Sequence, residues 1–246
     1  MINRSKYLVL FCLFIAINAL ALGPDVTRKT LELSEFQGIY VNSGYTVYLK
    51  QSNKQEVTVE VLSEIFSISE FKVENGILHI NVKQKKEDPN ASVWAKIDNI
   101  KIAPTMNVYI SVRDVNQLKV NGSGKIISEN SIASNNLDLG VSGSGAINID
   151  VKGRMLKTKI SGSGSMTLKG YASNNVIDIS GPGSLYAFDC EIQSAQAALS
   201  GSGNCEIHVA DELEAVVYGS GVLKHKGQTK NVVKKVYGKG EVDRAY

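Results

Sequence analysis

The chain has 246 residues, of which 43% are hydrophobic and four are proline, a composition that argues against a disordered protein. Its 27 basic and 24 acidic residues leave a formal charge of +3, which provides no basic stripe and predicts that no nucleic acid is bound. A chain of this length can hold one all-β domain or two smaller ones.

The N-terminal segment has the pattern of a signal peptide. Arg4 and Lys6 precede an almost uninterrupted apolar run over Tyr7–Leu22, and Ala19-Leu20-Ala21 supplies the small-x-small sequence that signal peptidase reads. The run is shorter than the roughly 20 apolar residues of a membrane-spanning helix. We therefore expect residues 1–21 to be cleaved, with a retained anchor as the alternative. Cleavage removes two bases and no acid, so the charge falls from +3 to +1, and it leaves no transmembrane segment.

Residues 22–105 form a β-rich region without an evident repeat. Turn residues at Glu74-Asn75-Gly76 predict a hairpin, and the charged run Lys83–Asn90 predicts an exposed loop. We expect antiparallel strands that cap, or lead into, the region that follows. The alternating apolar runs that predict these strands are Ile39–Leu49, Glu56–Leu62, Phe71–Val73 and Ile77–Val82.

Residues 106–246 contain an internal repeat. A Gly-x-Gly motif recurs seven times at spacings of 18 to 21 residues, about 19 on average. A fixed period near 20 is typical of a solenoid, in which each repeat buries its apolar face against its neighbours. The glycines of the motif are Gly122, Gly124, Gly143, Gly145, Gly162, Gly164, Gly181, Gly183, Gly201, Gly203, Gly219, Gly221, Gly238 and Gly240.

Apolar residues occupy fixed positions around each motif. Two positions before it stand Val120, Val141, Ile160, Ile179, Leu199, Val217 and Val236. Four positions after its first glycine stand Ile126, Ile147, Met166, Leu185, Cys205, Leu223 and Val242. Even offsets place these columns on one face of a strand.

The repeat predicts an all-β fold, a parallel β-helix of about seven 19-residue coils. We expect it to be right-handed because β-crossovers overwhelmingly are. A coil of this length allows three short faces joined by turns. Both glycines of each motif fall on the inward parity, so we interpret them as a tight corner where a side chain would collide with the interior.

The chain resembles the head GIN domain family of putative autotransporter adhesins. The Gly-Ser-Gly coils, Ile102-Ala103-Pro104 and Gly145-Ala146-Ile147-Asn148 carry the resemblance, which spans about Phe36–Val242. Pro182 and Lys239 depart from the pattern because they replace the central serine. The resemblance implies a parallel β-helix in a Gram-negative bacterium, exported to the periplasm, the outer membrane or the medium. It transfers no catalytic residues.

Residues capable of chemistry are scattered. His79, His208 and His225 lack the spacing of a zinc site, and no serine is paired with a base. Counted from the first glycine of their motifs, the positions of Cys190 and Cys205 differ by about five residues. This offset is too large for the Cα spacing of a disulfide and predicts two free thiols. We therefore expect no catalytic residue, no metal, no cofactor and no enzymatic activity.

Glu191 and Asp211 are the acids considered for a site. They share an offset in adjacent coils, where paired carboxylates can bind calcium or cleave glycosides. No acid continues the column into a third coil, so we interpret them as solvated turn residues.

Tyr218 and Tyr237 are the candidate ligand surface. They end an outward column that is otherwise small and polar, and adjacent exposed aromatics can stack on sugar rings or anchor a protein. The alternative is that the two rings cover the last coil, which has no evident capping helix. The leading hypothesis is a noncatalytic envelope or secreted protein that binds a glycan or an envelope or surface protein through the solenoid. The alternatives are a structural or assembly protein of the envelope and, third, a glycan-active β-helix enzyme.

Overall fold

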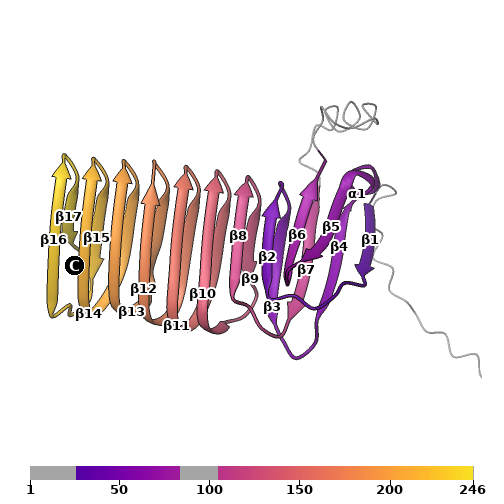
Figure 1. The fold of residues 1–246 in the computed structure, drawn as a ribbon, viewed down its shortest axis with the longest axis horizontal. Coiled ribbons are helices and arrows are strands. Elements are labelled where there is room, and N and C mark those ends of the chain that lie inside the picture. Colours follow the sequence, from indigo (N-terminus) through magenta and orange to yellow (C-terminus); the bar gives the residue numbers. More distant parts are fainter. Residues whose placement is uncertain (1–25, 84–104, 246) are drawn as a thin grey trace, which may run out of the picture.

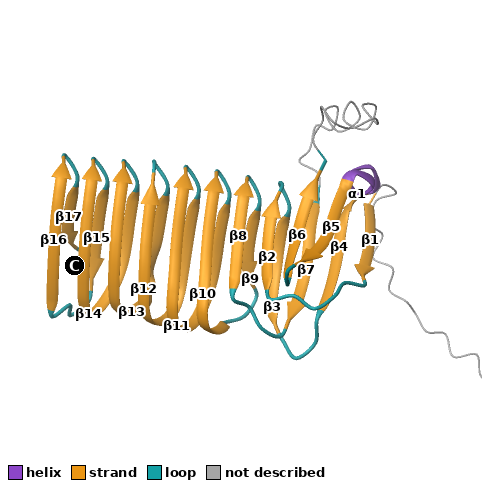
Figure 2. Cartoon of the chain, in the orientation of Figure 1, coloured by secondary structure: helices purple, strands orange, loops and turns teal. Residues whose placement is uncertain are grey.

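The computed structural model describes residues 26–83 and 105–245. The predicted signal peptide (1–21), all but the first residue of the predicted loop Lys83–Asn90, and Ile102-Ala103-Pro104 lie outside these residues. No helix in the described ranges is long and apolar enough to cross a membrane. Most described residues lie in strands stacked along one axis, as Figure 1 and Figure 2 show.

The repeat region is a parallel β-solenoid, which confirms the predicted fold. Each strand pairs in parallel with the strand one coil away, and Val141 lies opposite Val120 on one side and Ile160 on the other. The strands are β8 (Gln117–Gly122), β9 (Lys125–Ser128), β10 (Ile132–Gly143), β11 (Ala146–Gly162), β12 (Ser165–Ser180), β13 (Ser184–Gly201), β14 (Asn204–Gly219), β15 (Val222–Lys226), β16 (Asn231–Gly238) and β17 (Glu241–Arg244).

The coils differ in how they are divided into strands, whereas the sequence predicts three short faces for each coil. In the last coils β15 and β16 are separate strands, joined by a bend over residues 227–230, and the Gly-x-Gly corner then leads into β17. In the middle coils a single strand such as β11 continues through the bend.

The two glycines of each corner have different roles. The second glycine is buried, and a Cβ at Gly145 would lie 2.4 Å from Val120 Cγ1 of the preceding coil. The first glycine is not inward as expected: Gly143 is exposed and has a φ of +103°, a left-handed conformation that favours glycine. The corner therefore excludes side chains by contact at its second glycine and by backbone conformation at its first.

Two further coils lie in the N-terminal half. The expectation of antiparallel strands is wrong for them, because the β2/β3 coil pairs in parallel with β8 and β9 on one side and with β6 and β7 on the other. The chain thus places the β2/β3 coil between β6/β7 and β8/β9, out of sequence order. The strands are β2 (Gly38–Asn42), β3 (Thr46–Gln51), β6 (Ile77–Val82) and β7 (Met106–Val112).

Antiparallel strands cover the N-terminal end of this stack, as the sequence predicts. β1 pairs with β4, β4 with β7, and β5 with β6. Short helix α1 crosses over the end in Figure 1, and one continuous hydrophobic core runs from Phe36 to Val242. The capping elements are β1 (Val26–Leu31), β4 (Glu56–Leu62), α1 (Ser63–Ile68) and β5 (Ser69–Glu74).

Tyr45 occupies a corner position that the repeat gives to glycine. Thr46 pairs with Lys125, which places Tyr45 opposite Gly124. The Tyr45 side chain is fully buried, its hydroxyl lies 2.7 Å from Ser69 Oγ, and its ring packs edge-on against Phe71 with centroids 5.6 Å apart. Burial raises the pKa of Tyr45 to about 12. The corners of the repeat have no room for a side chain at this position. Here the Tyr45 side chain fills it and joins the solenoid to its cap.

The C-terminal end of the solenoid has no such cover in the described part of the chain. Val232 and Val236 continue the inward columns of Leu213 and Val217, yet both are exposed. Between them Lys234 takes the inward position of Ala215, and its Nζ donates to the Val242 carbonyl oxygen at 3.3 Å. A lysine therefore crosses the open end of the core from β16 to β17.

Candidate binding surfaces

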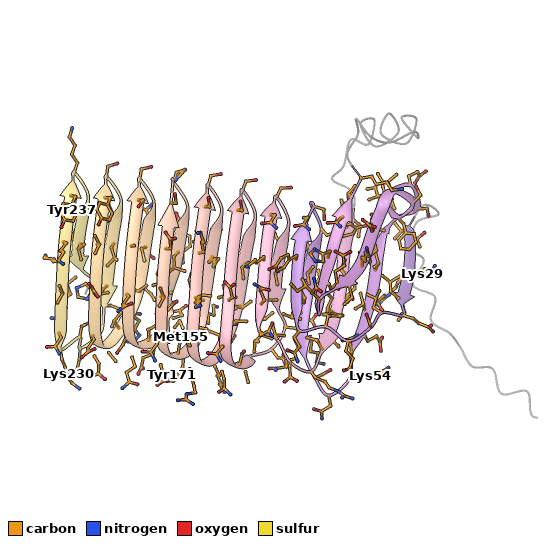
Figure 3. All side chains as sticks on the ribbon, in the orientation of Figure 1. Lys29, Lys54, Met155, Tyr171, Lys230 and Tyr237 are labelled. Carbon is orange, nitrogen blue, oxygen red and sulfur yellow. The ribbon has the colours of Figure 1, made fainter. Side chains whose placement is uncertain are left out.

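Tyr218 on β14 and Tyr237 on β16 lie one coil apart and face each other across the parallel ladder. Their rings are stacked, with centroids 5.2 Å apart and an interplanar angle of 9°, which confirms the predicted stack. The side chains are 51% and 56% exposed, and Figure 3 shows Tyr237 on the last coil. Because each ring covers one face of the other, the free ring faces are the side of Tyr218 toward Ser200 and the outer side of Tyr237.

Further outward residues extend this surface. Val233 is exposed, and Val216 lies opposite Lys235 in the column next to the tyrosines. Glu214 lies opposite Val233, so the side chains offer aromatic, aliphatic, cationic and anionic groups on two neighbouring strands. We call this surface the tyrosine face; it consists of Glu214, Val216, Tyr218, Val233, Lys235 and Tyr237.

Glu191 and Asp211, the two acids that share an offset from their corners, do not lie opposite each other. Glu191 lies opposite His208, because the β13–β14 register shifts between Ala187 and Glu191. Asp211 forms an ion pair with Lys230 and accepts a hydrogen bond from Gln193 Nε2 at 3.1 Å. The bond from Lys230 lowers the pKa of Asp211. A shared offset from the corner fails here because bulges change the number of residues in the bend.

The three histidines lie in separate places. The ring of His79 on β6 packs edge-on against Tyr40 at 5.2 Å, and His208 lies on β14. His225 on β15 is buried in the inward column, where burial lowers its pKa, with smaller contributions from Arg244 and Lys234. Within the described ranges, no three His, Cys, Asp or Glu side chains come together as a metal site.

Both cysteines of the repeat region are buried free thiols, as predicted. Cys190 lies opposite Gly170, whereas Cys205 lies opposite Leu185 and Leu223. Burial raises the pKa of Cys190 to about 12 and raises that of Cys205 as well, which keeps both protonated and unreactive at neutral pH.

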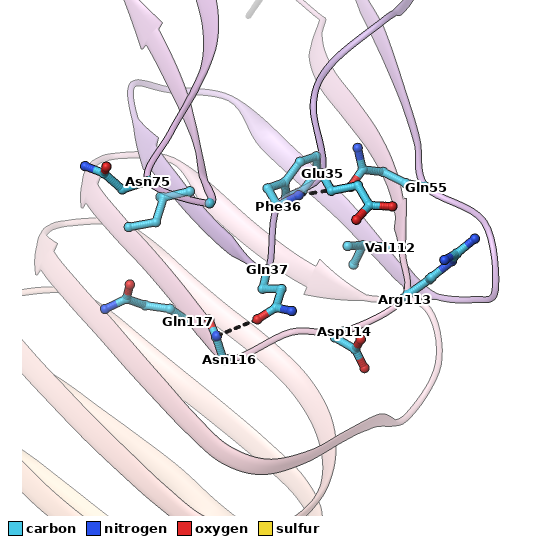
Figure 4. Close-up of a pocket in the computed structure, with 12 residues that line it drawn as sticks. Glu35, Phe36, Gln37, Gln55, Asn75, Val112, Arg113, Asp114, Asn116 and Gln117 are labelled. Carbon is cyan, nitrogen blue, oxygen red and sulfur yellow. Dashed lines mark hydrogen bonds between the residues drawn. The ribbon is translucent and has the colours of Figure 1, made fainter.

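A polar cleft of about 430 Å³ lies where the cap meets the solenoid (Figure 4). Sequence reasoning missed it, because its walls come from segments far apart in the chain, and no local pattern marks them. The walls are the loop before β2, the β5–β6 turn, Gln55 before β4 and the connection from β7 to β8. The polar lining residues are Glu35, Gln37, Gln55, Asn75, Arg113, Asp114, Asn116 and Gln117.

The comparisons with known proteins agree with this architecture. The family model described as putative auto-transporter adhesin, head GIN domain, matches residues 35–229. A putative adhesin from Bacteroides fragilis is similar with a TM-score of 0.79 and 20% identity, covering 91% of this chain and 98% of that chain. In Parabacteroides distasonis, a putative lipid binding protein (TM-score 0.71, 22% identity, 91% and 98% covered) and a putative adhesin (0.70, 22%, 90% and 97%) share the fold. No curated protein matches the sequence.

Proposed function

Because the chain belongs to the family of the putative auto-transporter adhesin head GIN domain, we propose that it is an exported, noncatalytic protein of the cell envelope or the medium that binds a glycan or a surface protein through the tyrosine face. Export is supported by the signal-peptide pattern of residues 1–21. Fold alone does not determine a ligand, so the proposal rests on the properties of the surface itself.

The observation that carries the proposal is the exposed stack of Tyr218 and Tyr237. Two large aromatic side chains, each more than half exposed, stand where the other coils have serine or asparagine. Their stacking holds both rings in one orientation, so little side-chain freedom is lost when a ligand binds. Tyrosine combines an apolar ring with a hydroxyl that can donate and accept hydrogen bonds, a combination suited to sugars and to protein interfaces.

A noncatalytic role is supported by the composition of this face. It contains valine, tyrosine and lysine with one acid, Glu214, and has no nucleophile beside a base. Glu191 lies opposite His208 and not opposite Asp211, so the register does not make these two acids a facing pair. The continuous core from Phe36 to Val242 favours a second candidate function, a rigid spacer in the envelope.

Binding to printed glycans and printed envelope proteins tests the proposal. The chain from residue 22 is compared with the double variant Tyr218→Ala/Tyr237→Ala, and Tyr186→Ala serves as the control because Tyr186 is an exposed tyrosine on β13. We expect the double variant to lose at least about tenfold in affinity, since aromatic anchors dominate such surfaces. Equal binding by all three proteins would exclude the tyrosine face, and absence of any binding would favour the spacer role.

A further inference from the structure

The polar cleft of Figure 4 is held open by hydrogen bonds between its walls. Asn116 Nδ2 donates to Gln37 Oε1 at 3.0 Å, and the Phe36 amide donates to Gln55 Oε1 at 3.1 Å. Backbone bonds add to these, because the Gln37 amide donates to the Gly76 carbonyl and the Asn116 amide donates to the Gln37 carbonyl. The four chain segments are therefore fixed relative to one another before any ligand arrives.

Several strong hydrogen-bonding groups in the cleft have no partner in the described part of the chain. Glu35 and Asp114 are exposed, and neither makes an ion pair or a side-chain hydrogen bond within residues 26–83 and 105–245. Arg113 uses Nε to donate to the Asn53 carbonyl at 2.8 Å, which leaves both terminal nitrogens available. Gln37 uses its oxygen and retains its two amide hydrogens.

These groups are arranged around an apolar floor. Phe36 and Val112 line the cleft and are buried. In Figure 4, Glu35, Arg113 and Asp114 lie toward one end, Asn75 and Gln117 toward the other, and Gln37 between them. The cleft thus offers carboxylate acceptors, guanidinium and amide donors, and a small apolar surface within a space the size of a small ligand.

The chemistry of the lining selects a ligand class. Carboxylates accept hydrogen bonds and guanidinium donates them, so the matching ligand must do both at neighbouring atoms, as vicinal hydroxyl groups do. Two acids against one arginine give the cleft a net charge of −1, which disfavours phosphate and uronate. A polar lining disfavours an acyl chain. We propose that this cleft binds a neutral sugar residue of a polysaccharide.

This site goes beyond the proposed function and does not depend on the tyrosine face. It lies at the junction of cap and solenoid, whereas the tyrosine face lies on the last coils at the other end of the axis (Figure 1). A polysaccharide bound in the cleft would occupy a preformed site on the rigid end of the molecule.

The test is an NMR titration of the 15N-labelled chain from residue 22. The probes are cellotetraose, maltotetraose and mannotetraose, with tetragalacturonate as the anionic counterpart, each raised to about 10 mM so that weak binding is observed. We expect at least one neutral probe to shift the backbone amide signals of Gln37, Asp114 and Asn116.

The variants Glu35→Gln and Asp114→Asn keep the shape of the side chains and remove their charge. Each is expected to weaken the neutral probe about tenfold, the effect of losing one charge-assisted hydrogen bond. Glu129→Gln, an exposed acid outside the cleft, should bind as the parent does. Unchanged spectra with all neutral probes, stronger binding of tetragalacturonate, or shifts confined to the tyrosine face would overturn this inference. The last of these results would leave the proposed function standing.

Discussion

Gly145 and Val120 are in contact across adjacent coils, because the position of a Cβ at Gly145 lies 2.4 Å from Val120 Cγ1 and 2.6 Å from the Gly124 carbonyl oxygen. The same relationship recurs between Gly164 and Val141, also at 2.4 Å. The valine of one coil therefore packs beneath the corner of the next. This contact explains why an apolar column and a glycine column run side by side through the repeat.

Substitution of Gly145 by alanine should destabilise the protein. The new methyl group would push against backbone and a buried valine, and overpacking of this kind costs about 3 kcal/mol. Gly140→Ala is the matched control, because its Cβ would meet only the flexible Lys119 side chain, at 3.1 Å. We expect the control to change the free energy of unfolding by less than about 1 kcal/mol. Urea denaturation measures both, and equal stabilities would contradict the role given to the corner.

The buried pair Thr158 and Asn175 should be replaceable by apolar residues. Thr158 Oγ1 donates to Asn175 Oδ1 at 3.0 Å, but Asn175 Nδ2 has no acceptor among the described residues. We expect Thr158→Val alone to cost about 1–2 kcal/mol, because it leaves both polar atoms of Asn175 unpaired. The double variant Thr158→Val/Asn175→Leu should be about 1 kcal/mol more stable than the parent. A double variant less stable than Thr158→Val would refute this account of the pair.

Lys234 should protect the open C-terminal end against association. Exposed sheet edges pair with other chains, and an inward-pointing lysine is a known protection because pairing would bury its charge. The variant Lys234→Ala carries the alanine of the preceding coil at this position. Its sedimentation coefficient should rise as the protein concentration is raised, which indicates association. Lys235→Ala removes the same charge from the outward side and should sediment as the parent does. Association by both variants would indicate a general charge effect.

The last coils should lose stability as the pH falls. Burial, together with Arg244 and Lys234, lowers the pKa of His225 below its value in the unfolded chain. The unfolded chain therefore binds a proton at His225 more readily than the folded chain does. The contribution of neutral His225 to the free energy of unfolding is complete above the unfolded pKa and decreases as the pH falls below it. As the pH falls from about 7.5 to about 5.5, the protection factors of the amides in β15 and β17 should decrease. A protection factor compares the measured exchange rate with the intrinsic rate at the same pH. The variant His225→Leu should remove this difference; its persistence would assign the effect to another group.

The repeat region could be predicted closely from the sequence because its contacts join equivalent positions about 19 residues apart. Val120, Val141 and Ile160 could be aligned by counting, and Tyr218 could be placed against Tyr237 in the same way. Counting failed for Glu191 and Asp211 because bulges lie between them and their corners.

The N-terminal half could not be predicted to the same degree. Its coils are assembled out of order, and the β2/β3 coil pairs with partners 39 and 79 residues away, as Tyr40 does with His79 and Lys119. Alternation identified these segments as strands but contained no information on their partners. The polar cleft depends on the same long-range crossings, so its lining residues have no common signal in the sequence.

A crystal structure of residues 22–246 soaked with a mixture of envelope glycans tests the central claim most directly. The tyrosine face predicts ordered density against the outer ring face of Tyr237 or against Tyr218 beside Ser200, on the exposed stack. Density elsewhere on the molecule, with both tyrosine rings bare, would contradict the claim that this face is the binding surface.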